Sequence, residues 1–99
     1  MNARLDIDPE QIADFCRRWK VAELALFGSV LHDTFRKDSD VDVLVTFAPD
    51  AHIGLIGLSR MEQELSDLLQ RKVDLVTKGG LKSAIREEIL REAEILYAA

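Results

Sequence analysis

The sequence predicts a small α/β domain in which helices cover a mixed sheet of three to four strands. Two observations carry this prediction. Segments with apolar residues at helical spacing alternate with short, strongly apolar runs that are typical of strands. A Gly-Ser pair ends one of these runs, and two aspartates open the next. A chain of 99 residues is long enough for one domain, residues 1–99, with one hydrophobic core.

The first helix is predicted to begin at Pro9, because Asp8 is a candidate N-cap and proline is tolerated in the first turn. One face of this helix is expected to pack inward, and its apolar residues are Ile12, Phe15, Cys16 and Trp19. The run Val21–Phe27 predicts the first strand, which ends at Gly28 and Ser29.

The remaining elements follow from the same patterns. Residues 30–35 predict a short helix or turn, and a polar loop leads into a second strand over residues 40–47. A third strand is predicted over residues 72–76. The helix between these strands is expected to start after a loop at residues 51–57, and its apolar stripe is Leu58, Met61, Leu65, Leu68 and Leu69. The tail predicts a last helix, with an inward stripe of Leu81, Ile85, Ile89, Ala93 and Leu96.

Charge and composition exclude several classes of protein. The net charge of −5 argues against a domain that grips nucleic acid directly through a basic surface. No apolar run approaches the roughly 18 residues of a membrane span, and acidic residues stand where a signal peptide would be apolar. Cys16 is the single cysteine, so no internal disulfide can form. We therefore expect a cytoplasmic protein without a membrane partner.

Asp40 and Asp42 are the strongest candidate functional residues. They are two positions apart in a predicted strand, so both side chains point to one face with Cα atoms about 6.5–7 Å apart. Two carboxylates held in this way suit a divalent metal. The turn at Gly28 allows a phosphate to approach the backbone, and Ser29 can begin a short helix whose N–H groups face an anion, although it could instead be a simple cap. Metal and phosphate together indicate a nucleoside triphosphate.

Asp74 is the natural third carboxylate. It lies between Val73 and Leu75 in the third predicted strand, where a charge is costly unless something binds it. If this strand pairs beside the second one, the three acids converge. In the alternative interpretation, Asp40 is a strand-entry residue, Asp42 lies on a solvated face, and Asp74 faces solvent on an edge strand.

At these residues the chain resembles the minimal nucleotidyltransferases of the polymerase-beta superfamily, the group that includes antitoxins of HEPN/MNT toxin–antitoxin systems. Their signature is Gly-Ser, about ten residues, Asp-x-Asp, and a third acid on a later strand. The corresponding residues here are Gly28-Ser29, Asp40-Val41-Asp42 and Asp74. The resemblance covers nearly the whole chain, implies the nucleotidyltransferase fold, and extends to the tail, which looks like the family's usual last helix.

The resemblance implies a role for each of these residues. Asp40 and Asp42 would bind two Mg²⁺ ions that hold the triphosphate of ATP, and Asp74, a further metal ligand, would help to activate the attacking hydroxyl. Gly28 and Ser29 would hold the outer phosphates. Together they would perform an in-line displacement with pyrophosphate as the leaving group.

The chain departs from the family at one point. The family often continues Gly-Ser-x-x-Arg-Gly, whereas His32 and Asp33 occupy those last two positions here. A neutral histidine is a weaker phosphate partner than arginine, and a neighbouring aspartate repels phosphate. Arg36 is a candidate to substitute in part, although a basic loop residue is more often simply solvated.

The resemblance also implies a partner. Minimal domains of this type commonly serve as antitoxins of a HEPN-type RNase toxin and add AMP to a tyrosine on it. We therefore expect transfer of a nucleoside monophosphate, AMP from ATP, to a hydroxyl of that toxin or of another acceptor protein. Two alternatives stay open. The chain could be an antitoxin that acts by binding alone, or it could modify a small molecule, for which a homo-oligomer would supply the cleft.

Overall fold

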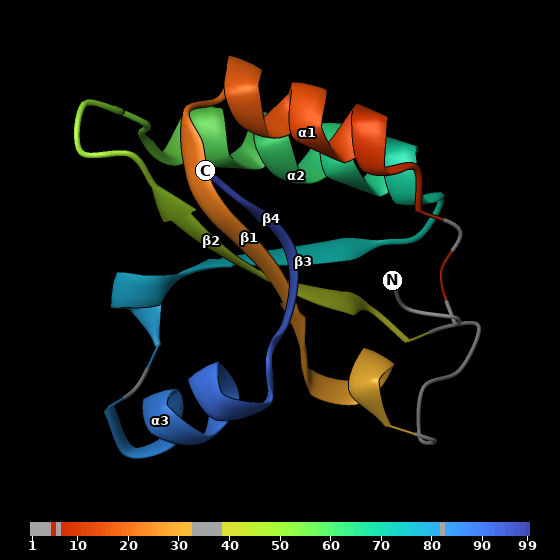
Figure 1. The fold of residues 1–99 in the computed structure, drawn as a ribbon, viewed down its shortest axis with the longest axis vertical. Coiled ribbons are helices and arrows are strands. Elements are labelled where there is room, and N and C mark those ends of the chain that lie inside the picture. The colour runs from red at the N-terminus through yellow and green to blue at the C-terminus, as the bar shows by residue number, and fades with distance from the viewer. Residues whose placement is uncertain (1–4, 6, 33–38, 82) are drawn as a thin grey trace.

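The computed structural model describes residues 5, 7–32, 39–81 and 83–99, and Figure 1 shows the arrangement of its helices and strands. In chain order the elements are α1 (Pro9–Arg18), β1 (Val21–Phe27), the 3₁₀ turn η1 (Gly28–Leu31), β2 (Val41–Phe47), α2 (Leu55–Leu69), β3 (Val73–Thr77), the 3₁₀ turn η2 (Lys78–Gly80), α3 (Ser83–Glu92) and β4 (Glu94–Ala98).

The four strands form one mixed sheet in the order β3-β2-β1-β4. The central strand β1 pairs antiparallel with both β2 and β4. The strand β3 pairs parallel with β2, and the crossover between them is α2. This architecture confirms the predicted α/β class and places β3 and β4 at the two edges of the sheet.

The first helix begins as the sequence predicts. Asp8 has extended backbone angles, and its side chain accepts a hydrogen bond from the Glu10 N–H at 3.0 Å. Ile12, Phe15 and Cys16 are buried against the sheet. Burial raises the pKa of the Cys16 thiol to about 12, so this cysteine is a neutral core residue rather than a nucleophile.

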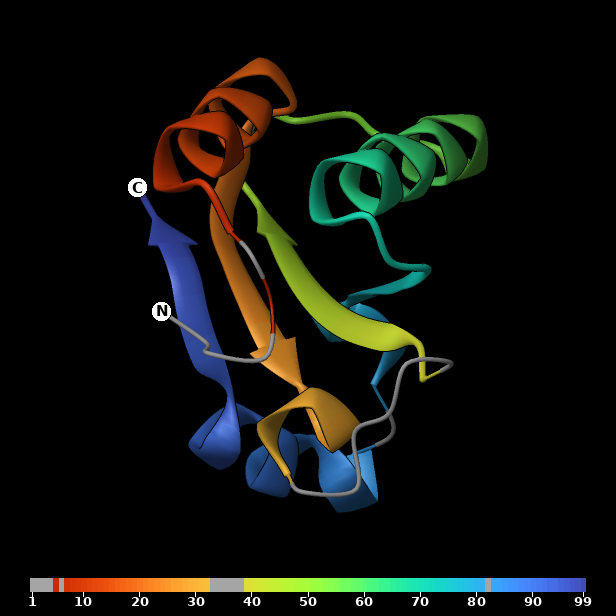
Figure 2. The same cartoon turned by 90° about the vertical axis from the view of Figure 1, so that its right-hand side faces the viewer.

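Helices cover both faces of the sheet. Figures 1 and 2 show α1 and α2 as one layer, with α3 on the opposite side. The larger core cluster lies under α1 and α2 and includes Phe15, Leu24, Val43, Met61 and Leu65. The smaller cluster lies under α3 and contains Ala25, Phe27, Leu44 and Leu81, with Ile89 and Ala93 packed against it. No helix among the described residues is long and apolar enough to cross a lipid bilayer.

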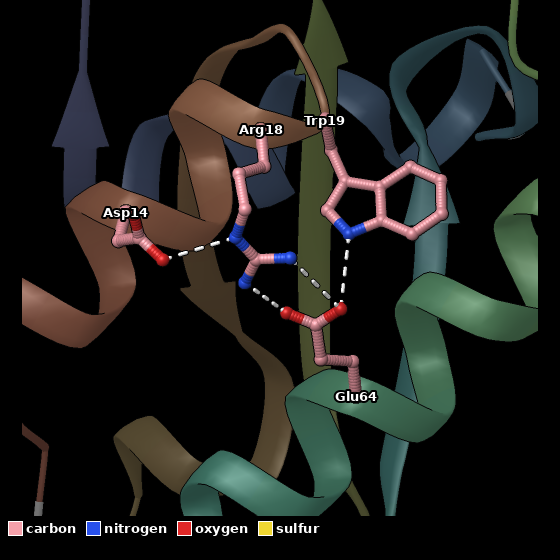
Figure 3. Close-up of polar contacts among 4 residues, drawn as sticks. All are labelled: Asp14, Arg18, Trp19 and Glu64. Carbon is pink, nitrogen blue, oxygen red and sulfur yellow. Dashed lines mark hydrogen bonds and ion pairs between the residues drawn. The ribbon is translucent and has the colours of Figure 1, made fainter.

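Glu64 joins the two helices of the larger layer (Figure 3). Its carboxylate pairs with the guanidinium of Arg18, which also donates a hydrogen bond to Asp14 at 3.0 Å. The Trp19 indole N–H donates to the same carboxylate at 3.2 Å. The hydrogen bond from Arg18 is the main reason why the pKa of Glu64 is lowered, with a further contribution from Trp19. This cluster fixes the end of α1 beside the middle of α2.

The tail of the chain corrects the sequence prediction. The predicted last helix ends at Glu92, and Glu94–Ala98 forms β4 along the free edge of β1. The Ala99 N–H continues this pairing by donating to the Ala22 carbonyl at 2.8 Å. The apolar spacing fits a helix locally, but the backbone groups of β1 need hydrogen-bond partners on both sides, and the tail supplies them.

One further boundary and one core assignment also differ from expectation. Helix α2 begins at Leu55, so the predicted loop is shorter than expected. Its first two residues, Leu55 and Ile56, are 85% and 76% exposed, which is why the inward stripe does not reveal this turn. In α3, Ile85 is 45% exposed and does not belong to the inward face.

Candidate active site

Asp42 and Asp74 lie directly beside each other in the sheet. They are register partners in the parallel pair β2–β3, whose strands are about 4.7–4.9 Å apart. Side chains at register partners leave the sheet on the same face. For Asp42 this is the face of Leu44, which packs in the smaller cluster with Val76 at its edge. The pairing of the second and third predicted strands, which the convergence of the acids requires, is therefore present.

Gly28 brings the turn after β1 against this pair. Phe27 is the register partner of Asp42 across β1 and β2, so Gly28 follows at the end of the ladder. A Cβ atom at Gly28 would lie 2.3 Å from Oδ2 of Asp42, and the φ angle of Gly28 is +76°. Both the space and the backbone angle require glycine here. The predicted phosphate turn and the predicted metal carboxylate are thus in van der Waals contact.

Ser29 continues this turn as the second residue of η1 and is half-buried. Its carbonyl accepts a hydrogen bond from the His32 N–H at 2.9 Å, which closes the turn. His32 is exposed, and its Nε2 lies 3.8 Å from a carboxylate oxygen of Glu92 at the end of α3. Arg36 and Asp33, the other predicted or divergent residues of this region, lie outside the described residues.

Asp40 is exposed and precedes β2, which begins at Val41. Its backbone is nevertheless held on both sides by the segment that enters β3. The Val41 N–H donates to the Lys72 carbonyl at 2.8 Å, and Arg71 Nη2 donates to the Ser39 carbonyl at 2.9 Å. Sequence reasoning missed Arg71, because no local pattern links a residue after a helix end to a loop thirty residues earlier.

The outer edge of β3 is held by α2. The Val73 N–H donates to Ser66 Oγ at 3.0 Å, and the Leu75 N–H donates to Glu62 Oε2 at 2.9 Å. Asp74 lies between these two anchored residues. These bonds satisfy edge groups that would otherwise be open to pairing with another chain. They also fix the part of β3 that carries the third acid.

The electrostatics of the site favour a bound cation. Burial raises the pKa of Asp42, and the neighbouring carboxylates of Asp74 and Asp40 raise it further. Three oxygen-donor groups with this mutual repulsion fit a hard divalent ion such as Mg²⁺. Within the described part of the chain, no three His, Cys, Asp or Glu side chains are already gathered as a ligand set. The acids thus share one end of the sheet without forming a finished coordination shell.

Comparison with known proteins places this chain in a family. The nucleotidyltransferase domain family matches residues 9–96, so the chain belongs to it. The predicted nucleotidyltransferase activity class is thereby confirmed. Among curated proteins, the chain is 41% identical over 75 residues to the protein adenylyltransferase MntA of Thermococcus cleftensis. This alignment covers 76% of the chain and 74% of that relative.

Solved structures agree on the fold. A toxin–antitoxin crystal structure with AMP-PNP is similar at a TM-score of 0.74 and 23% identity, covering 94% of this chain and 75% of the other. A complex of a tri-AMPylated HEPN toxin of Shewanella oneidensis with MNT antitoxin is similar at a TM-score of 0.66 and 22% identity. That match covers 92% of this chain and 70% of the other. The expected nucleotidyltransferase fold is confirmed by these likenesses.

Proposed function

We infer that this chain transfers AMP from ATP to a hydroxyl group of a partner protein, and that the partner is a HEPN-type toxin. The observation that carries the proposal is the contact of Gly28 with Asp42, beside Asp74 in the same register. It joins a turn that phosphate can approach to a pair of carboxylates that a cation would neutralise. The curated relative is named a protein adenylyltransferase, which supports protein as the acceptor.

Each residue has a proposed role. Asp40, Asp42 and Asp74 would hold two Mg²⁺ ions, which when bound supply positive charge for the triphosphate and the departing pyrophosphate. Gly28 and Ser29 would lie against the outer phosphates, and Arg36 is proposed as a further phosphate contact. In the reaction, the acceptor oxygen attacks the α-phosphorus, and the bond to the bridging oxygen of pyrophosphate breaks. The exposed carboxylate of Asp74 is the candidate acceptor for the hydroxyl proton.

The setting of the reaction is also proposed. AMPylation of a HEPN toxin in a structurally similar complex supports a HEPN acceptor, and a homo-oligomer is the alternative source of an acceptor surface. We propose that residues 1–99 act as one minimal domain, because β1 and β4 come from opposite ends of the chain and pair in one sheet. We propose the cytoplasm as the site of action, because a chain with one cysteine forms no internal disulfide and suits a reducing compartment.

The proposal is tested with α-labelled ATP and Mg²⁺, with and without the protein encoded beside this chain. Label is expected on the partner with the wild type and with Asp67→Asn, an exposed aspartate of α2 outside the site. No label is expected with Asp42→Asn. Labelling that persists in Asp42→Asn would contradict the assignment of the site.

A second function, neutralisation by binding alone, is favoured by His32 and Asp33, which replace the family's arginine and glycine. Its signature would be the absence of label with any of the four nucleotides, while Asp42→Asn still neutralises the toxin. Label that appears on a small hydroxyl compound but on no protein would support the small-molecule alternative instead.

A further inference from the structure

We propose that Arg71 is a positioning residue that holds Asp40 in place for metal binding. The inference rests on the proposed function, because it assumes that Asp40 is a metal ligand. Arg71 itself carries a positive charge and is not a candidate ligand. Its guanidinium acts instead on the backbone next to Asp40, through the hydrogen bond from Nη2 to the Ser39 carbonyl at 2.9 Å.

The start of the Arg71 side chain is fixed by the end of α2. Gln70 adopts the left-handed conformation, with a φ of 52°, and ends the helix. The Arg71 N–H then donates to the Ser66 carbonyl at 3.2 Å, which is the 6→1 hydrogen bond typical of a Schellman-type helix end. Arg71 is half-buried, so its stem is confined as well. Because its backbone N–H and its stem are both restrained, the guanidinium of Arg71 is pre-organised for its acceptor.

Asp40 depends on this contact more than the other acids do. Asp42 and Asp74 belong to paired strands, whereas Asp40 precedes β2 and takes no part in the described strand register. The backbone on its C-terminal side is fixed by the bond from the Val41 N–H to the Lys72 carbonyl. On its N-terminal side, Arg71 fixes the Ser39 carbonyl. The two bonds come from adjacent residues, 71 and 72, and enclose Asp40 between them.

The contact of Arg71 affects how much the acids must be ordered when they bind a metal. The three acids are not already gathered as ligands in the described structure, so a metal must select side-chain conformations in which all three carboxylates face it. Fixing the backbone on both sides of Asp40 lowers the conformational entropy that this residue loses when a metal binds. Removal of a group that orients a metal ligand without binding the metal itself typically lowers metal affinity by about 10–100-fold.

The test measures Mn²⁺ binding directly by electron paramagnetic resonance of the free ion, so it does not depend on turnover. Arg71→Met keeps the aliphatic stem but removes the donors, and Arg71→Lys keeps the charge and one possible donor. Arg60→Met is the matched control, since Arg60 is an exposed arginine of α2. We expect Arg71→Met to weaken Mn²⁺ binding about tenfold. Arg71→Lys should show a smaller loss and Arg60→Met none.

Circular dichroism at the titration temperature establishes that each variant is folded. Mn²⁺ affinity equal to wild type in folded Arg71→Met would overturn the positioning role and leave the proposed function intact. If Arg71→Met does not fold, Arg71→Gln, which removes the charge and shortens the side chain, decides, and wild-type affinity in that variant overturns the role. Mn²⁺ binding that is the same in wild type and Asp42→Asn would overturn both the inference and the metal site on which it rests.

Discussion

Asp42 and Asp74 occupy the same register position of two parallel neighbouring strands. Their carboxylates therefore leave the sheet on one face, at a separation set by the spacing of the strands rather than by flexible loops. Both strands are tied to further structure, β2 through β1 and β3 through α2. A pair of acids built in this way keeps its spacing when no cation is bound, at the cost of mutual repulsion.

Removing the charge of Asp74 tests its role in the reaction. Asp74→Asn is expected to lower AMP transfer by at least about a hundredfold, because metal and proton handling each account for a few kcal/mol of the barrier. Initial rates with α-labelled ATP measure this effect. The fold should persist, since Asp74 is exposed. A rate within a few-fold of wild type would remove Asp74 from the proposed site.

Gly28→Ala should both destabilise the protein and abolish transfer. The positive φ alone costs about 1–2 kcal/mol for a residue with a Cβ, and the approach to Asp42 Oδ2 adds to it. Urea denaturation measures the free energy of unfolding. Gly79→Ala is the control, because its added Cβ would meet nothing within 4 Å, and its stability should stay within about 0.5 kcal/mol of wild type.

Asp42→Asn should stabilise the protein at neutral pH while it inactivates the enzyme. The pKa of Asp42 is raised above its ordinary value of 3.8 in the folded state, so the folded chain binds the proton more tightly than the unfolded chain. Stability is therefore lost as pH rises through the interval between these two pKa values. The gain of the variant is reduced by solvent screening, because Asp42 is only partly buried, and it should be present at pH 7 and disappear below pH 3.8.

Thermal or urea unfolding of wild type and Asp42→Asn across this pH range is the measurement. Asp67→Asn serves as the control, since the exposed Asp67 accepts a hydrogen bond from Gln63 and lies outside the site. A variant that is less stable than wild type at pH 7 would show that the Asp42 carboxylate is compensated in the folded protein.

Ser66→Ala should loosen the outer edge of β3. The Val73 N–H loses its acceptor, and an unpaired, partly buried donor costs about 1 kcal/mol. Hydrogen exchange at the Val73 amide should become faster, whereas exchange in the centre of β1 should follow only the change in global stability. Unchanged exchange at Val73 would mean that solvent replaces the hydroxyl without loss.

Glu64→Gln tests the cluster that joins α1 to α2 (Figure 3). The pKa of Glu64 is lowered in the folded state, so its stabilising contribution is present above its ordinary value of 4.5 and is lost as pH falls through the folded pKa. We expect a modest loss of stability at pH 7, smaller than that of Gly28→Ala, and no loss at low pH. Transfer activity should be retained, because Glu64 lies in the helix layer on the opposite face from Leu44 and Asp42.

Local patterns were sufficient for the elements whose own residues specify their structure. The cap at Asp8 and the apolar stripe predicted α1, and the apolar run Val21–Phe27 predicted β1. The same reasoning failed for the tail, where Ile89 and Ala93 follow helical spacing but Glu94–Ala98 is a strand. A strand at that position depends on a partner, and the partner, β1, lies about seventy residues earlier in the chain.

The sequence by itself determined which residues could carry the chemistry: a glycine turn, two aspartates two positions apart where a strand begins, and a third acid in a later strand. These features follow from residue type and the period of the backbone, which are local properties. Only the tertiary structure decided that β3 pairs with β2 in the register that places Asp74 beside Asp42, and that Arg71 reaches Ser39. Such contacts join residues far apart in the chain, so they exist only once the core has fixed how helices and strands pack.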